Sequence, residues 1–155
     1  MIQRKQSLFL LLAVIAYALC LFLPIAGVTP AGMGAEGLVY NLGMVDGDKE
    51  LQFLEICLPL FLLLALSTVI SLATIFLYKN RKLQMNLCSI ASLFTGLWCV
   101  DYALMLFGVV PLTDNGEMNV KFAACLPIVS LVLVLMARKG VQDDEKLIKA
   151  ADRIR

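Results

Sequence analysis

The chain has 155 residues, of which 61% are hydrophobic and 16% charged, whereas a typical soluble domain is about 45–50% apolar and about 25% charged. A soluble domain of this length would leave long Leu, Phe and Val runs facing water, so the composition predicts a membrane protein. The formal charge of +1 argues against nucleic-acid binding, which needs a concentrated basic surface.

The first predicted element is a membrane helix over about residues 8–28. This run follows Arg4 and Lys5, and it is long enough to cross a hydrocarbon core of about 30 Å. It exceeds the apolar core of about 7–15 residues found in a cleavable signal peptide, and Pro24 lies near its far end. We therefore expect a retained helix rather than a signal peptide.

The next segment, residues 29–51, is predicted to be a loop outside the membrane. It combines five glycines with several acidic residues, a composition that supplies turns rather than a packed core. A second membrane helix is predicted over about residues 53–77. Pro59 falls in its opening turns, where proline is tolerated best.

Two further membrane helices are predicted after a basic turn. Residues 78–82 read Tyr-Lys-Asn-Arg-Lys, a tight turn that makes the third helix, about residues 83–110, return antiparallel. A second polar loop follows at residues 111–121. The last helix is predicted over about residues 120–137, with Lys121 reaching back to the membrane interface because the apolar run alone is short.

Residues 140–155 are predicted to form an amphipathic tail helix. Acids at its start and arginines at its end both suit the helix dipole. The basic residues assigned to membrane or partner binding are Lys146, Lys149, Arg153 and Arg155. Such a helix can lie on the cytoplasmic leaflet, cover the inner end of the bundle, or bind a partner, and these interpretations stay open.

The orientation follows from the distribution of lysine and arginine, which are kept on the cytoplasmic side near helix ends. Only Lys49 and Lys121 fall on one face, and all other basic residues fall on the opposite face. Both termini are therefore predicted to be cytoplasmic, which four crossings satisfy. The predicted fold is all-α: a polytopic membrane protein with a four-helix transmembrane domain (1–139) and a cytoplasmic tail helix (140–155).

Small hydroxyl residues recur at helical spacing on the second and third predicted helices. The members of this hydroxyl seam are Ser67, Ser71, Thr74, Ser92 and Thr95. Small residues let membrane helices approach closely, and a hydroxyl bond across the seam adds about 0.6–2 kcal/mol. We interpret the seam as helix packing; the alternative is a polar path or ligand groove.

Asp101 is the one acidic residue deep in an apolar run, flanked by Trp98 and Tyr102. The midpoint between Lys82 and Asp114 is about residue 98, so Asp101 is expected roughly 5 Å to the outer side of the bilayer centre. A charge there costs about 2.5–3.5 kcal/mol, so the three residues form a candidate intramembrane polar site. Either a protonated Asp101 bonds a neighbouring helix, or it serves a proton, a cation or a partner subunit.

The chain contains no histidine, the commonest metal ligand and the proton shuttle near neutral pH. Its five cysteines lie in apolar runs without C-x-x-C spacing, and we interpret them as small buried apolar residues. We therefore expect no metal, no cofactor and no catalytic residue.

Both ends of the chain carry the most distinctive residues. Met1-Ile2-Gln3-Arg4, the turn Lys79-Asn80-Arg81-Lys82 and the ending from Asp144 to Arg155 resemble the domain-of-unknown-function 4293 family of small four-helix membrane proteins from Bacteroidota. The resemblance implies a bacterial inner-membrane location and no established activity.

These observations favour a non-enzymatic accessory or scaffold protein of the inner membrane. Its expected partners are the lipid bilayer and another membrane or cytoplasmic protein. The alternative is a small transporter or a protein that binds lipids or amphiphiles through Asp101. The sequence predicts neither the partner nor the oligomeric state.

Overall fold

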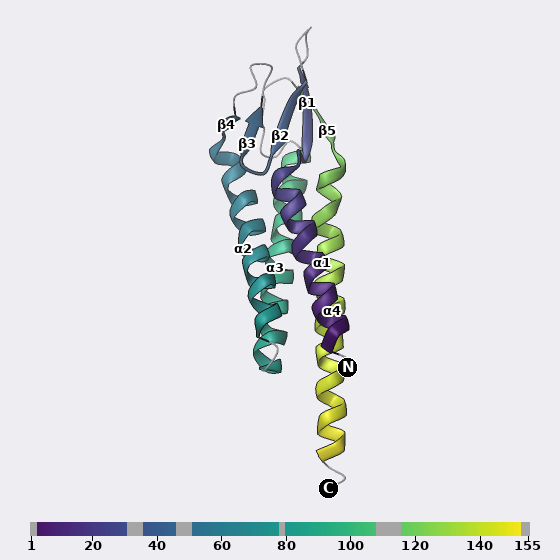
Figure 1. The fold of residues 1–155 in the computed structure, drawn as a ribbon. Helices are drawn as coiled ribbons and strands as arrows, with labels where there is room; N and C mark the ends of the chain where they lie inside the picture. The colour runs from purple at the N-terminus through teal and green to yellow at the C-terminus, as the bar shows by residue number, and fades with distance from the viewer. Residues whose placement is uncertain (1–2, 31–35, 46–50, 78–79, 108–115, 153–155) are drawn as a thin grey trace.

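In a computed structural model, the chain forms a bundle of four helices with a five-stranded antiparallel sheet at one end (Figure 1). The structure describes residues 3–30, 36–45, 51–77, 80–107 and 116–152. The helices are α1 (Gln3–Phe22), α2 (Leu58–Phe76), α3 (Arg81–Leu106) and α4 (Leu126–Asp152). We call the end that carries the sheet the sheet end, and the end where α1 begins and α3 begins the basic end.

Three helical segments are long and apolar enough to cross a membrane: Glu55–Phe76, Arg81–Leu106 and Phe122–Leu147. A shorter apolar helix spans Gln6–Phe22 within α1. Large apolar side chains cover the outside of the bundle, whereas alanine, serine, threonine and cysteine fill much of its interior. This arrangement is the reverse of a soluble bundle, and it suits a lipid environment. The predicted four-helix architecture is confirmed.

The strands are β1 (Ala26–Pro30), β2 (Gly37–Tyr40), β3 (Gly43–Val45), β4 (Leu51–Phe53) and β5 (Gly116–Val120). They are ordered β4-β3-β2-β1-β5, and every neighbouring pair is antiparallel. β1, which begins within the first predicted helix, pairs with β5 from the second predicted loop, with Ala26 opposite Val120 and Pro30 opposite Gly116. The all-α prediction therefore needs correction, because both segments predicted as loops contribute strands.

The first helix also ends earlier than predicted, at Phe22 rather than near residue 28. Pro24 accounts for this end, since a proline disfavours helical geometry in the residue before it and lacks a backbone N–H. The chain then turns directly into β1. The other helices begin as their sequences suggest: Pro59 lies in the first turn of α2, and Asn80 caps α3 by accepting a bond from Leu83 N at 3.5 Å.

The predicted tail helix is not a separate element. A short 3-10 turn (Phe122–Cys125) leads into α4, which continues without a break to Asp152. Figure 1 shows the last part of α4 (yellow) extending along the bundle axis beyond the basic ends of the other helices. Gly140 lies inside this helix, so it does not end it.

The contact between α1 and α4 is the most extensive one in the bundle. Small residues make it close: Ser130 of α4 donates to the Ala13 carbonyl of α1 at 3.3 Å. Near the basic end, a Cβ built on Gly140 would lie 3.0 Å from Gln6 Cγ, so glycine permits this approach. Gln6 itself is buried, and its side-chain amide donates to the Asp144 carboxylate. The beginning of the predicted tail is therefore packed against α1.

Candidate functional site

A buried polar cluster joins the sheet to the helices. Asn41 lies in the two-residue turn between β2 and β3 and is fully buried. Asparagine suits such tight hairpin turns. Its side-chain amide donates to the Cys20 carbonyl at 2.7 Å, one of the last carbonyls of α1, which have no partner within the helix. The turn of a hairpin thus caps the end of a helix.

The same asparagine is held from the other side by α3. Trp98 Nε1 donates to Asn41 Oδ1 at 3.0 Å, and the indole is almost fully buried. Tyr102 stacks on Trp98 with ring centroids 5.2 Å apart, and its hydroxyl donates to the Ile25 carbonyl at 2.9 Å, just before β1. We call Cys20, Ile25, Asn41, Trp98 and Tyr102 the sheet–bundle junction. Its hydrogen bonds connect α1, α3 and the sheet in the buried core.

A second polar contact lies deeper in the bundle, where three helices meet. Tyr17 Oη of α1 lies 2.6 Å from Thr95 Oγ1 of α3. Because the Thr95 proton is directed at the Ala91 carbonyl (2.8 Å), Tyr17 is the donor. Ser67 Oγ of α2 is 3.4 Å from Thr95 Oγ1 and donates to the Leu63 carbonyl. Part of the predicted seam therefore meets here, joined by a tyrosine that the sequence reasoning did not include.

The remaining seam residues do not bond across the helices. Thr74 donates to the Ile70 carbonyl of its own helix, and Ser92 donates to the Ser89 carbonyl and is only half-buried. Ser71 Oγ is buried without a hydrogen-bond partner among the described residues. Ser67, Ser71 and Thr74 of α2 are all buried, so this part of the seam allows close packing. Among the seam residues, hydrogen bonding between helices occurs at Thr95.

Substituting Thr95 with valine tests this contact. Valine keeps the shape of threonine but leaves the buried Tyr17 hydroxyl without its acceptor. We expect the free energy of unfolding to fall by about 1–2 kcal/mol, measured by SDS titration in mixed micelles. Ser92→Ala is the matched control and should change it by less than about 0.5 kcal/mol. Equal effects of the two substitutions would contradict the assignment.

The structure separates Asp101 from Trp98 and Tyr102. The two aromatic residues face the interior, whereas Asp101 is half-buried and lies within electrostatic range of Cys57, the residue before α2. Asp101 Oδ2 is buried without a hydrogen-bond partner among the described residues.

Asp101 also lies nearer the bundle end than predicted. Because α3 ends at Leu106, its midpoint falls between Leu93 and Phe94, and Asp101 lies about 11 Å from it toward the sheet end. The expectation of roughly 5 Å placed the centre at about residue 98, midway between Lys82 and Asp114.

The basic tail residues are only partly described. Lys146 is exposed and lies 3.7 Å from Asp143 on the same helix, and Leu147 beside it is also exposed. The backbone of Lys149 belongs to α4, while Arg153 and Arg155 lie outside the described residues.

The described parts of the chain hold no group of three or more His, Cys, Asp or Glu residues suited to a metal ion. Cys20, Cys57 and Cys88 are buried, as the apolar interpretation requires, and Cys99 is half-buried. Cys125 differs from that interpretation, because it is exposed at the sheet end of α4.

Sequence reasoning missed Asn41 and Tyr17. One signal was available for Asn41, an asparagine before Leu42-Gly43 in a segment of alternating apolar residues, which favours a hairpin turn. Its contact with Trp98, far along the chain, had no local signal.

Helices with an apolar outer surface, three of them long enough to cross a bilayer, define a helical-bundle membrane protein. The chain belongs to the family described as "Domain of unknown function (DUF4293)", which matches residues 2–154. None of the curated proteins compared with the chain matches it.

Proposed function

We propose that this protein is a non-enzymatic accessory or scaffold protein of a bacterial inner membrane, which presents the end of α4 to a partner protein in the cytoplasm. The observation that carries the proposal is the continuity of α4 over 27 residues. At 1.5 Å per residue the helix is about 40 Å long, against a hydrocarbon core of about 30 Å. The helix therefore extends past the bilayer.

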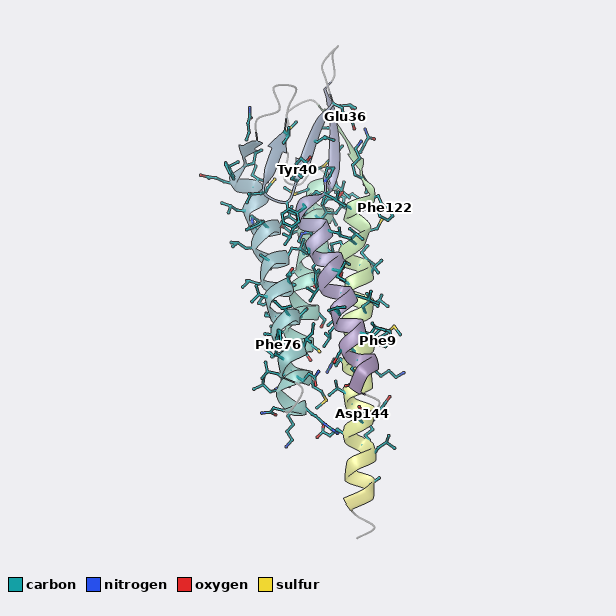
Figure 2. The ribbon with its side chains drawn as sticks, in the orientation of Figure 1. Phe9, Glu36, Tyr40, Phe76, Phe122 and Asp144 are labelled. Atoms are coloured by element: carbon teal, nitrogen blue, oxygen red, sulfur yellow. The ribbon has the colours of Figure 1, made fainter. Side chains whose placement is uncertain are left out.

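Exposed phenylalanines support this placement in the membrane. Four of them lie at or just beyond the sheet ends of the helices, in α1, β4, the cap of α3 and the turn before α4, and all are more than two-thirds exposed: Phe22, Phe53, Phe107 and Phe122. Figure 2 shows Phe122 at the sheet end and Phe76 near the opposite end of α2. With the apolar surface between these levels in lipid, the sheet lies on one side and the end of α4 on the other.

The orientation follows from charge. Apart from Lys121, the lysines and arginines of the described residues lie at the end of the bundle opposite the sheet. Lys121 lies at the sheet end, where its Nζ is 2.7 Å from Glu36 Oε1. The positive-inside rule places the basic end, and with it both chain termini, in the cytoplasm.

The end of α4 continues straight out of the bundle, and this direction favours binding to a partner protein over binding to the membrane surface. To lie on the leaflet, the helix would need a sharp bend near Gly140, but α4 is helical through that residue and Val141 is buried against the bundle. Residues 146–155 contain four basic residues and one acidic residue, so the expected partner surface is acidic.

Truncation after Glu145 tests the proposal. This end point keeps Val141 and the Asp144–Gln6 bond, which belong to the bundle. We expect a photocrosslinker placed at Leu147, which is 61% exposed, to capture a discrete protein adduct in native membranes. Without crosslinking, the same partner should copurify with the full-length protein through an N-terminal tag, and the truncated protein, which lacks Leu147, should recover at least about tenfold less of it.

Two controls make the result specific. Lys146→Glu with Lys149→Glu keeps the helix and should weaken recovery, whereas Asp101→Asn should leave it unchanged. Unchanged recovery after truncation would refute the docking function. A small molecule or lipid that is lost only in Asp101→Asn would instead support the transporter or amphiphile-binding alternative.

A further inference from the structure

Two arginines at the basic end have buried nitrogen atoms without partners. Arg81 Nη1 on α3 and Arg138 Nε on α4 are both inaccessible to solvent, and neither atom has a hydrogen-bond partner among the described residues. A buried, charged donor that lacks an acceptor is costly, and guanidinium groups prefer carboxylate or phosphate oxygens. Both residues are half-buried, so the buried part of each guanidinium group can bind an anion that reaches it from outside the bundle.

The two side chains border the same interface. Arg81, Gln84 and Cys88 lie on one face of α3, since they are spaced by three and four residues. Gln84 and Cys88 are buried on this face, and Arg138 lies within electrostatic range of Cys88. Both guanidinium groups are therefore placed at the basic end of the contact between α3 and α4.

Two acids near the basic end have other partners among the described residues. Asp144 accepts the bond from Gln6 of α1, and Asp143 lies beside Lys146. In the described part of the chain, the ion pairs involve neither Arg81 nor Arg138. Two like charges at one interface repel each other, so an anion between them would be bound favourably.

The position of Arg138 indicates where this anion comes from. Arg138 is roughly 25 Å along the helix from the exposed Phe122, close to the thickness of a hydrocarbon core of about 30 Å. Leu83, Leu135 and Met136 beside the arginines are exposed apolar residues that face the acyl region.

We propose that Arg81 and Arg138 bind the phosphate group of an anionic phospholipid of the cytoplasmic leaflet. A guanidinium group can donate two parallel N–H bonds to the oxygens of one phosphate. The buried side chains of Gln84 and Cys88 close the site on the side of the bundle interior. This lipid would hold α3 against α4 at the level where α4 leaves the membrane.

The test uses the full-length protein in a neutral detergent. Native mass spectrometry measures the Kd of added phosphatidylglycerol, with phosphatidylcholine and inorganic phosphate as separate arms. We expect phosphatidylglycerol to bind most tightly, and Arg81→Gln or Arg138→Gln to weaken it about 10- to 100-fold. Arg138→Lys keeps the positive charge but loses the paired N–H donors of the guanidinium group, so its Kd should lie between those of the wild type and Arg138→Gln.

Adjacent lysines provide matched controls. Lys82→Gln and Lys139→Gln remove the same charge from exposed neighbours and should weaken binding by less than about threefold. Melting curves without lipid check folding, and Arg138→Gln should not lower the midpoint, because it removes a half-buried charge whose Nε has no partner among the described residues. Equal losses in the lysine and arginine variants would overturn the site, and equal binding of inorganic phosphate would overturn its assignment to a lipid.

Discussion

Replacing Trp98 with alanine is expected to lower the free energy of unfolding by about 3–5 kcal/mol, the largest effect of any single substitution considered. Trp98 is 1% exposed, stacks on Tyr102 and donates to Asn41. Alanine removes the ring contacts and leaves Asn41 Oδ1 without its donor. The measurement is SDS titration in mixed micelles, followed by far-UV circular dichroism.

Two companion substitutions separate packing from hydrogen bonding. Trp98→Phe keeps an aromatic ring but loses Nε1–H, so we expect a loss of about 1–3 kcal/mol. Leu97→Ala removes an apolar side chain that faces outward, 47% exposed, and should cost less than about 1 kcal/mol. If Trp98→Ala cost no more than Leu97→Ala, the sheet–bundle junction would not be a major source of stability.

Replacing Gly43 with alanine is expected to detach the edge of the sheet. A Cβ at this position would lie 2.1 Å from the Gln52 carbonyl oxygen and 3.0 Å from its carbon, both backbone atoms of the paired strand. The strands must separate to admit it, at a cost of about 1–3 kcal/mol. Hydrogen exchange should accelerate at least about tenfold for amides of β3 and β4.

Gly96 in the middle of α3 provides the matched control. A Cβ built there meets no atom within 4 Å, so Gly96→Ala should leave exchange in the sheet unchanged. It should stabilise the helix by up to about 1 kcal/mol, because glycine is the poorer helix former. Unaltered exchange of β3 and β4 in Gly43→Ala would show that these strands do not pair as described.

The four helices could be predicted from sequence because the length of an apolar run is a local property. Each of the four runs produced a helix, and Pro59 and the basic turn lie where α2 begins and where α3 follows it. The helix ends were predicted less accurately. Residues 26–28 are apolar enough to extend a membrane helix, yet they begin a strand, because Pro24 ends α1 and β5 supplies a partner.

The sheet could not be predicted in the same way. Its strands contain three to five residues, and glycine-rich segments of that length are typical of turns. The contacts of the candidate site could not be predicted either. Trp98 and Tyr102 were identified beside Asp101, but they bond to Asn41 and to the Ile25 carbonyl, respectively. Thr95 was correctly placed in a contact between helices, while its strongest partner, Tyr17, comes from α1.

Three features follow from the sequence alone: an apolar composition suited to lipid, four helices, and basic residues concentrated at one end of the bundle. Each of them depends on residues that are close along the chain. Only the tertiary structure decided the pairing of β1 with β5, the capping of α1 by Asn41 and the approach of Arg138 to the Cys88 face. These contacts join segments far apart in sequence, so they contribute to the free energy of folding only after the helices have packed.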